Sequence, residues 1–68
     1  MTAKKVESII KADGWDRVDN GGSGHRQYEH PTKKGKVTIS FCDSSKDLPR
    51  RTLGSIFRQA QLDVHDYM

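Results

Sequence analysis

The sequence predicts a small α+β domain with the element order α-β-β-β-α. Apolar residues recur at helical spacing near both ends of the chain, whereas the middle alternates polar and apolar residues as strands do. The 68 residues supply one core, which we place in a single domain at residues 1–62, followed by a tail at 63–68 that we expect to fray. Both helical stripes are buried only if the two helices cover one face of a three-stranded antiparallel sheet, so the other face stays open to solvent.

The first helix is predicted over residues 2–13, where Val6 and Ile10 belong to one apolar face. Thr2 suits the N-cap position, because its hydroxyl can accept a hydrogen bond from the first turn. Gly14 suits the left-handed conformation that ends many helices.

Three strands are predicted in the runs "WDRV", "HRQYEH" and "KVTISF". The glycine-rich segment "DNGGSG" and the segment "PTKKG" separate them as turns, which predicts an antiparallel meander. In the last strand Val37, Ile39 and Phe41 share the core face. If Tyr28 packs against the same core, His25 projects from the opposite, outward face of the middle strand.

A second helix is predicted from Pro49 to near Gln61, with an apolar stripe that includes Leu53 and Phe57. Gly54 lies inside this helix, where glycine costs about 1 kcal/mol relative to alanine. We interpret Gly54 as a position of close packing against a neighbouring element.

The chain is moderately basic, with 12 Lys and Arg against 9 Asp and Glu and a formal net charge of +3. Cations outnumber acids between Arg26 and Lys36, and again at Arg50, Arg51 and Arg58. Such clusters favour a polyanionic partner such as nucleic acid, although each is equally compatible with a solvated surface.

A single cysteine, Cys42, excludes an internal disulfide and is interpreted as a buried thiol rather than a reactive one. One unpaired cysteine fits a reducing compartment. The N-terminal residues hold no apolar run long enough for a signal peptide or a membrane span, so we expect a cytoplasmic protein without membrane partners.

Neither a metal site nor a nucleophilic triad is predicted. His25, His30, Cys42 and His65 match no spacing typical of metal ligands, and no nucleophile elbow is present. The segment "GGSG" precedes a strand rather than a helix, so it is a turn and not a phosphate-binding loop.

His25 remains as a candidate for chemistry, because imidazole is the side chain that most readily takes and returns a proton near neutrality. RNA cleavage needs a base that removes the proton from a 2′-hydroxyl, and cations that stabilise the charge on the phosphoryl oxygens. From the residues alone, however, a lone surface histidine is usually a solvated strand residue without a catalytic role.

The runs "GHRQYEHPTKKGKVTIS" and "KDLPRRTLGSIFRQAQL" resemble the HicA family of toxins from bacterial type II toxin-antitoxin modules. The likeness extends from "VESIIKADGW" through Leu62. It implies a fold like the double-stranded-RNA-binding domain, and an endoribonuclease that cleaves mRNA without metal or other cofactor. It also implies a HicB-type antitoxin that binds the toxin and blocks its active site.

The resemblance places His25 at the catalytic position, Tyr28 at a buried aromatic position, and His30 in a turn or packing role. In the family the catalytic histidine follows Gly-Ser, whereas here it follows Ser23-Gly24. This departure either alters backbone donors near the phosphate or weakens the nuclease. The family also usually has glycine where this chain has Gln61, which predicts a poorer helix end.

RNA contacts are expected from eight residues: Ser23, Gly24, Arg26, Lys33, Lys34, Lys36, Arg50 and Arg51. The three lysines are as compatible with a solubilising role. Arg50 and Arg51 oppose the helix dipole at a helix start, which favours a phosphate-binding function for them.

These observations predict a sequence-tolerant ribonuclease toxin, inhibited by an antitoxin that covers a basic, outward sheet face. An alternative is a non-catalytic module that binds double-stranded RNA through its backbone and 2′-hydroxyls. A third interpretation is a partner-binding protein with no affinity for RNA.

Overall fold

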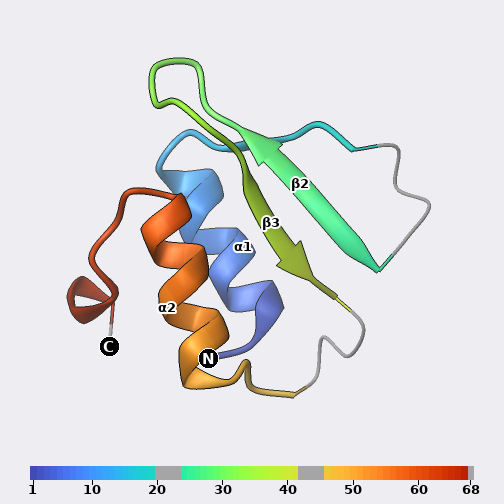
Figure 1. Ribbon diagram of the computed structural model, residues 1–68, viewed down its shortest axis with the longest axis vertical. Coiled ribbons are helices and arrows are strands. Elements are labelled where there is room, and N and C mark those ends of the chain that lie inside the picture. The colour runs from blue at the N-terminus through green and yellow to red at the C-terminus, as the bar shows by residue number, and fades with distance from the viewer. Residues whose placement is uncertain (20–23, 42–45, 68) are drawn as a thin grey trace.

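A computed structural model describes residues 1–19, 24–41 and 46–67, and it confirms the predicted α-β-β-β-α order (Figure 1). A single 3-10 turn, η1, follows the second helix. The elements are α1 (Ala3–Ala12), β1 (Asp16–Arg17), β2 (His25–Glu29), β3 (Val37–Ser40), α2 (Arg50–Gln59) and η1 (Val64–Asp66).

Helix α1 begins and ends where the sequence predicts. The Thr2 hydroxyl accepts a hydrogen bond from the Lys5 N–H at 3.2 Å, as an N-cap does. Gly14 follows the helix with a φ of +111°, in the left-handed region that glycine enters without strain. These two local signals fix both ends of α1.

The sheet has the strand order β1-β2-β3, and all its pairs are antiparallel. Tyr28 lies opposite Val37, and His25 lies opposite Ser40 at the other end of the β2–β3 ladder. Strand β1 is shorter than the run "WDRV", because the Trp15 N–H donates to the Ile10 carbonyl at 3.1 Å and so completes the end of α1 instead.

Both helices pack on the same face of the sheet. Strand alternation directs Tyr28, Val37 and Ile39 towards the helices, and all three are buried. The buried apolar residues form one cluster: Ala3, Val6, Ile10, Trp15, Tyr28, Val37, Ile39, Leu53, Ile56, Phe57 and Ala60. The polar side chains of Gln27, Glu29 and Thr38 are exposed on the opposite face, as predicted.

Helix α2 ends at Gln59, two residues earlier than predicted, and Gln61 follows with a φ of +59°. Gln61 therefore adopts the left-handed conformation that glycine usually takes at a helix end. Its Nε2 donates to the Lys34 carbonyl at 2.9 Å, which attaches the end of α2 to the β2–β3 turn. At the end of the helix, Gln59 Oε1 accepts a hydrogen bond from the Thr38 N–H of β3 at 3.0 Å.

The segment after α2 contains the single turn η1. The Asp63 carboxylate accepts a hydrogen bond from the His65 N–H at 2.9 Å, and this bond lowers the pKa of Asp63. The Tyr67 ring lies 5.6 Å from the Phe57 ring, centroid to centroid. Fraying of this segment stays a prediction. No helix among the described residues is long and apolar enough to cross a membrane.

The prediction of close packing at Gly54 is wrong, because a Cβ built there meets no atom of a neighbouring element within 4 Å. We therefore expect Gly54→Ala to raise the free energy of unfolding by about 1 kcal/mol, the helix propensity difference. Urea denaturation measures this change. The matched variant Gly14→Ala should instead destabilise, since Gly14 has a positive φ and its Cβ would lie 2.8 Å from His30 Nε2. A destabilised Gly54→Ala would contradict the prediction.

Candidate functional site

His25 begins β2 and is exposed on the open face of the sheet. Its neighbour on the partner strand is Ser40, and its neighbour along the same face is Gln27. The outward direction predicted from strand alternation is therefore observed. An imidazole in this position is accessible to a substrate lying across the sheet.

His30 has a structural role in the fold. Its side chain is only 9% exposed, and its Nδ1 accepts hydrogen bonds from the N–H groups of Thr32 at 3.1 Å and Lys33 at 3.0 Å. The ring hydrogen is therefore on Nε2, which donates to the Asp13 carbonyl at 2.8 Å. His30 thus connects the end of α1 to the β2–β3 turn, in agreement with the expected turn or packing role.

Lys33 is also engaged within the fold. Its ammonium lies 2.6 Å from Asp13 Oδ2 and 3.2 Å from the Ala60 carbonyl, and the side chain is 25% exposed. It therefore joins the C-terminal ends of both helices. RNA would have to compete with these two partners for Lys33.

Arg26 lies on the helix side of β2, where its Nη1 is 3.0 Å from Glu7 Oε2 of α1. Its guanidinium stacks over the Phe41 ring, with Cζ 4.1 Å from the ring centroid. The Tyr28 hydroxyl donates to the same oxygen of Glu7. A side chain expected to contact RNA is thus bound between a carboxylate and an aromatic ring.

The same cluster shifts two pKa values. Burial raises the pKa of Glu7, but hydrogen bonds from Tyr28 and Arg26, together with nearby positive charge, outweigh burial and leave the pKa below its ordinary value. Burial, and then the hydrogen bond to Glu7, raise the pKa of Tyr28. Glu7 is therefore a carboxylate, and Tyr28 a neutral donor, at neutral pH.

Glu7→Gln should lower the free energy of unfolding by about 1–3 kcal/mol at pH 7, because a charged acceptor is lost. Since the pKa of Glu7 is lowered by folding, its carboxylate stabilises the protein above its unfolded pKa, and this stability is lost as the pH falls through the folded value. Urea midpoints at pH 7, 5 and 3 should show the wild type and the variant converging in acid. Glu29→Gln, at a carboxylate 53% exposed, is the control. Equal effects of both variants at pH 7 would contradict the prediction.

Sequence reasoning missed Glu7 and Phe41 as partners of Arg26. One signal for Glu7 was present, since it stands four residues after Ala3 and three before Ile10. It therefore lies along the apolar stripe of α1, where a carboxylate needs a partner.

The remaining predicted cations are exposed. Lys34 lies in the β2–β3 turn, and Lys36 Nζ is 3.9 Å from Glu29 Oε2 on the open face. Arg50 and Arg51 begin α2, whose first turn holds no acidic residue. Gly24 is exposed and its carbonyl accepts a hydrogen bond from the Phe41 N–H, whereas Ser23 lies outside the described residues.

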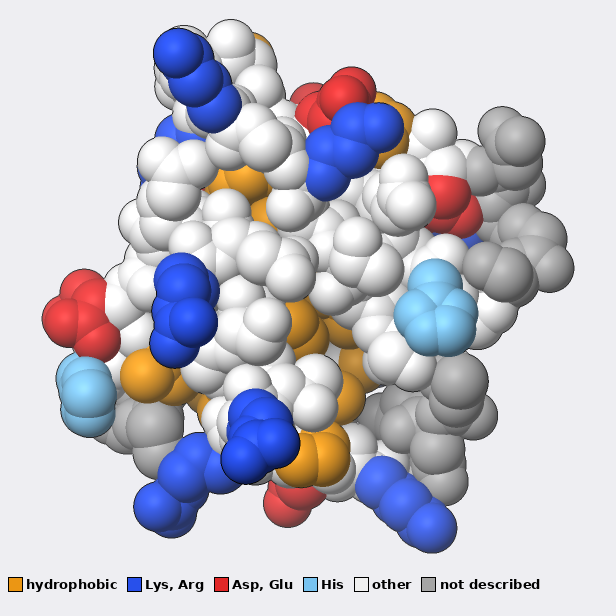
Figure 2. Space-filling view, in the orientation of Figure 1, with side chains coloured by type: hydrophobic (Ala, Val, Ile, Leu, Met, Phe, Trp, Pro, Cys, Tyr) orange, Lys and Arg blue, Asp and Glu red, His pale blue; other side chains and the backbone are white. Residues whose placement is uncertain are grey.

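The outward sheet face is mixed in charge rather than basic, which corrects the expectation of a basic face. Of the cations near the hairpin, Arg26 and Lys33 are directed to the helix side, and Lys36 is accompanied by Glu29. Figure 2 shows the Lys and Arg side chains of one face of the molecule spread over that face and along its edges rather than gathered in one patch.

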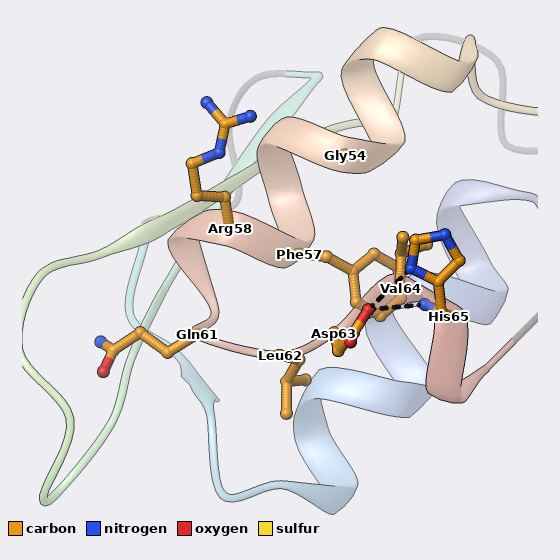
Figure 3. A pocket seen from close by; sticks show the side chains of 8 residues that line it. All are labelled: Gly54, Phe57, Arg58, Gln61, Leu62, Asp63, Val64 and His65. Atoms are coloured by element: carbon orange, nitrogen blue, oxygen red, sulfur yellow. Dashed lines mark hydrogen bonds and ion pairs between the residues drawn. The ribbon is translucent and has the colours of Figure 1, made fainter.

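A shallow hollow lies between α2 and the C-terminal segment (Figure 3). His65 Nδ1 and Asp63 Oδ1 lie 3.1 Å apart there. The residues that line the hollow are Gly54, Phe57, Arg58, Gln61, Leu62, Asp63, Val64 and His65. None of the predicted site residues belongs to this set, so the hollow is not the His25 site.

Within residues 1–19, 24–41 and 46–67, no three His, Cys, Asp or Glu side chains are grouped so that they could hold a metal ion. Cys42 lies outside these ranges.

Comparison with known families gives one finding for this chain. Residues 3–62 match the family model described as HicA toxin of bacterial toxin-antitoxin systems. No curated protein sequence matches the chain significantly.

Proposed function

Since the chain belongs to the HicA toxin family, we propose that it is a toxin that cleaves mRNA with His25 as the proton-transfer group. The observation that carries this proposal is the contrast between the two hairpin histidines. The His30 side chain is only 9% exposed, whereas His25 is exposed on the open face. His25 is therefore the hairpin imidazole that a substrate can reach.

In the proposed reaction, His25 removes the proton from a ribose 2′-hydroxyl. The 2′-oxygen then attacks the adjacent phosphorus, and the bond from phosphorus to the 5′-oxygen breaks. The products are a 2′,3′-cyclic phosphate and a 5′-hydroxyl, which takes up one proton as it leaves. No step requires a metal ion.

We propose that the phosphates are held by Lys34, Lys36, Arg50 and Arg51, with Ser23 and Gly24 beside the reacting group. The exposure of the four cations supports this assignment. Arg26 and Lys33 are the weaker candidates, because RNA contact would break their bonds to carboxylates within the fold.

The partner that we propose is a HicB-type antitoxin, acting together with the toxin in the cytoplasm. The uncovered face of the sheet that carries His25 supports this proposal, because a protein bound across it would exclude RNA from the imidazole. The polar and mixed charge of this face fits a protein surface better than it fits a purely electrostatic contact.

Incubation of the purified protein with end-labelled RNA tests the function, with product separation on a denaturing gel. We expect cleavage products, and the same products after EDTA is added. Intact RNA that is bound with a steep salt dependence would instead indicate the non-catalytic RNA-binding module. Absence of RNA affinity at low salt would indicate a partner-binding protein, and loss of cleavage in EDTA would contradict the metal-free mechanism.

A further inference from the structure

We propose that Arg26 is a positioning residue, held between Glu7 and Phe41 so that the start of β2 presents His25 in a fixed direction. We call these three residues the Arg26 clamp. The effect on cleavage rests on the proposed function of His25, whereas the effect on the direction of His25 does not.

The clamp lies at the end of the β2–β3 ladder that carries His25. His25 pairs with Ser40, and the last backbone hydrogen bond described at this end runs from the Phe41 N–H to the Gly24 carbonyl. The end of a ladder is where strands separate most readily. The direction of His25 therefore depends on what holds this last pair together.

Arg26 holds both strands at this point and attaches them to α1. Its guanidinium covers Phe41, which follows β3, and its Nη1 binds Glu7 at 3.0 Å. Glu7 is itself held by the Tyr28 hydroxyl, and its side chain is only 14% exposed. The clamp thus connects α1, the start of β2 and the end of β3.

The side-chain alternation of a strand connects the clamp to His25. Arg26 and His25 are adjacent in β2, so they project from opposite faces of the same strand. A rotation of the strand that moved His25 would move Arg26 out of its contacts with Glu7 and Phe41. Fixing Arg26 on the helix side therefore fixes His25 on the open side.

Kinetics of Arg26→Met separate positioning from RNA binding. We expect kcat to fall about ten- to hundredfold with KM unchanged, since misplaced catalytic groups lose rate rather than affinity. Arg17→Met, at an arginine of β1 that is paired with Asp19, is the matched control and should leave kcat and KM unchanged. A rise in KM with a salt dependence weaker by about one charge would overturn the proposal, because it would show that Arg26 grips a phosphate.

The other clamp residues should act through Arg26. Glu7→Gln and Phe41→Leu are expected to lower kcat in the same direction, and each should add little to Arg26→Met, because all three disrupt one unit. Full additivity of the losses would contradict a single clamp. All assays are made without urea, at a temperature at which circular dichroism shows each variant to be folded.

The orientation of the His25 side chain can also be followed without RNA. In NMR spectra the imidazole signals of His25 should shift in Phe41→Leu, whereas those of His65 should stay in place. If the wild type cuts no RNA, the proposed function fails while this comparison still decides the positioning claim. Unchanged His25 signals in a folded Phe41→Leu variant would overturn the clamp itself.

Discussion

Replacement of His25 by alanine is expected to lower RNA cleavage by about 10²–10⁴-fold, the usual contribution of a general acid or base. The fold should persist, because His25 is exposed and its side chain lies outside the buried cluster. The free energy of unfolding of His25→Ala should stay within about 0.5 kcal/mol of the wild-type value. Growth arrest on expression in bacteria should disappear together with cleavage.

His65→Ala is the matched control, since His65 is also an exposed histidine, with 86% of its side chain accessible, and lies in η1. We expect this variant to cleave RNA at the rate of the wild type. Cleavage by His25→Ala at the wild-type rate would exclude His25 as the proton-transfer group. Loss of cleavage in both variants would assign the effect to something other than the β2 imidazole.

Replacement of Trp15 by alanine is expected to unfold the protein. Trp15, which lies between α1 and β1 in the chain, is fully buried, and its ring contacts the His30 ring edge to face with the centroids 5.2 Å apart. Truncating a buried tryptophan costs about 3–5 kcal/mol. A core of this size supplies only about 3–5 kcal/mol of net stability, so the loss removes nearly all of it.

Far-ultraviolet circular dichroism in increasing urea measures this loss without depending on tryptophan fluorescence. Trp15→Phe should have an intermediate midpoint, because it retains an aromatic ring against His30. Val18→Ala, at a side chain 45% exposed, should leave the midpoint nearly unchanged. A folded Trp15→Ala with the wild-type midpoint would contradict this view of the core.

The architecture could be predicted because its signals are local. Thr2 and Gly14 mark the ends of α1 by their own backbone preferences. Strand alternation around Tyr28 was sufficient to predict that His25 lies on the open face of the sheet. Each of these inferences needs only residues that are close together in the chain.

The placement of the cations could not be predicted, because it depends on residues far apart in the chain. Arg26 binds Glu7, 19 residues away, and Lys33 binds Asp13, 20 residues away. The sequence shows that Arg26 and Lys33 are charged but not which carboxylate the fold brings beside them. For this reason the basic stretch in the hairpin sequence predicts a basic surface that the fold does not form.

The contact between Gln59 and the backbone of Thr38 has a consequence for assembly. Strand β3 lies at a border of the sheet, where free N–H groups can template pairing with a strand of another chain. Gln59 Oε1 accepts the hydrogen bond of one of these N–H groups, that of Thr38. This contact hinders both aggregation through β3 and extension of the sheet by a partner. An antitoxin that added a strand there would first have to displace Gln59, whereas one that lay flat across the exposed face would meet no such barrier.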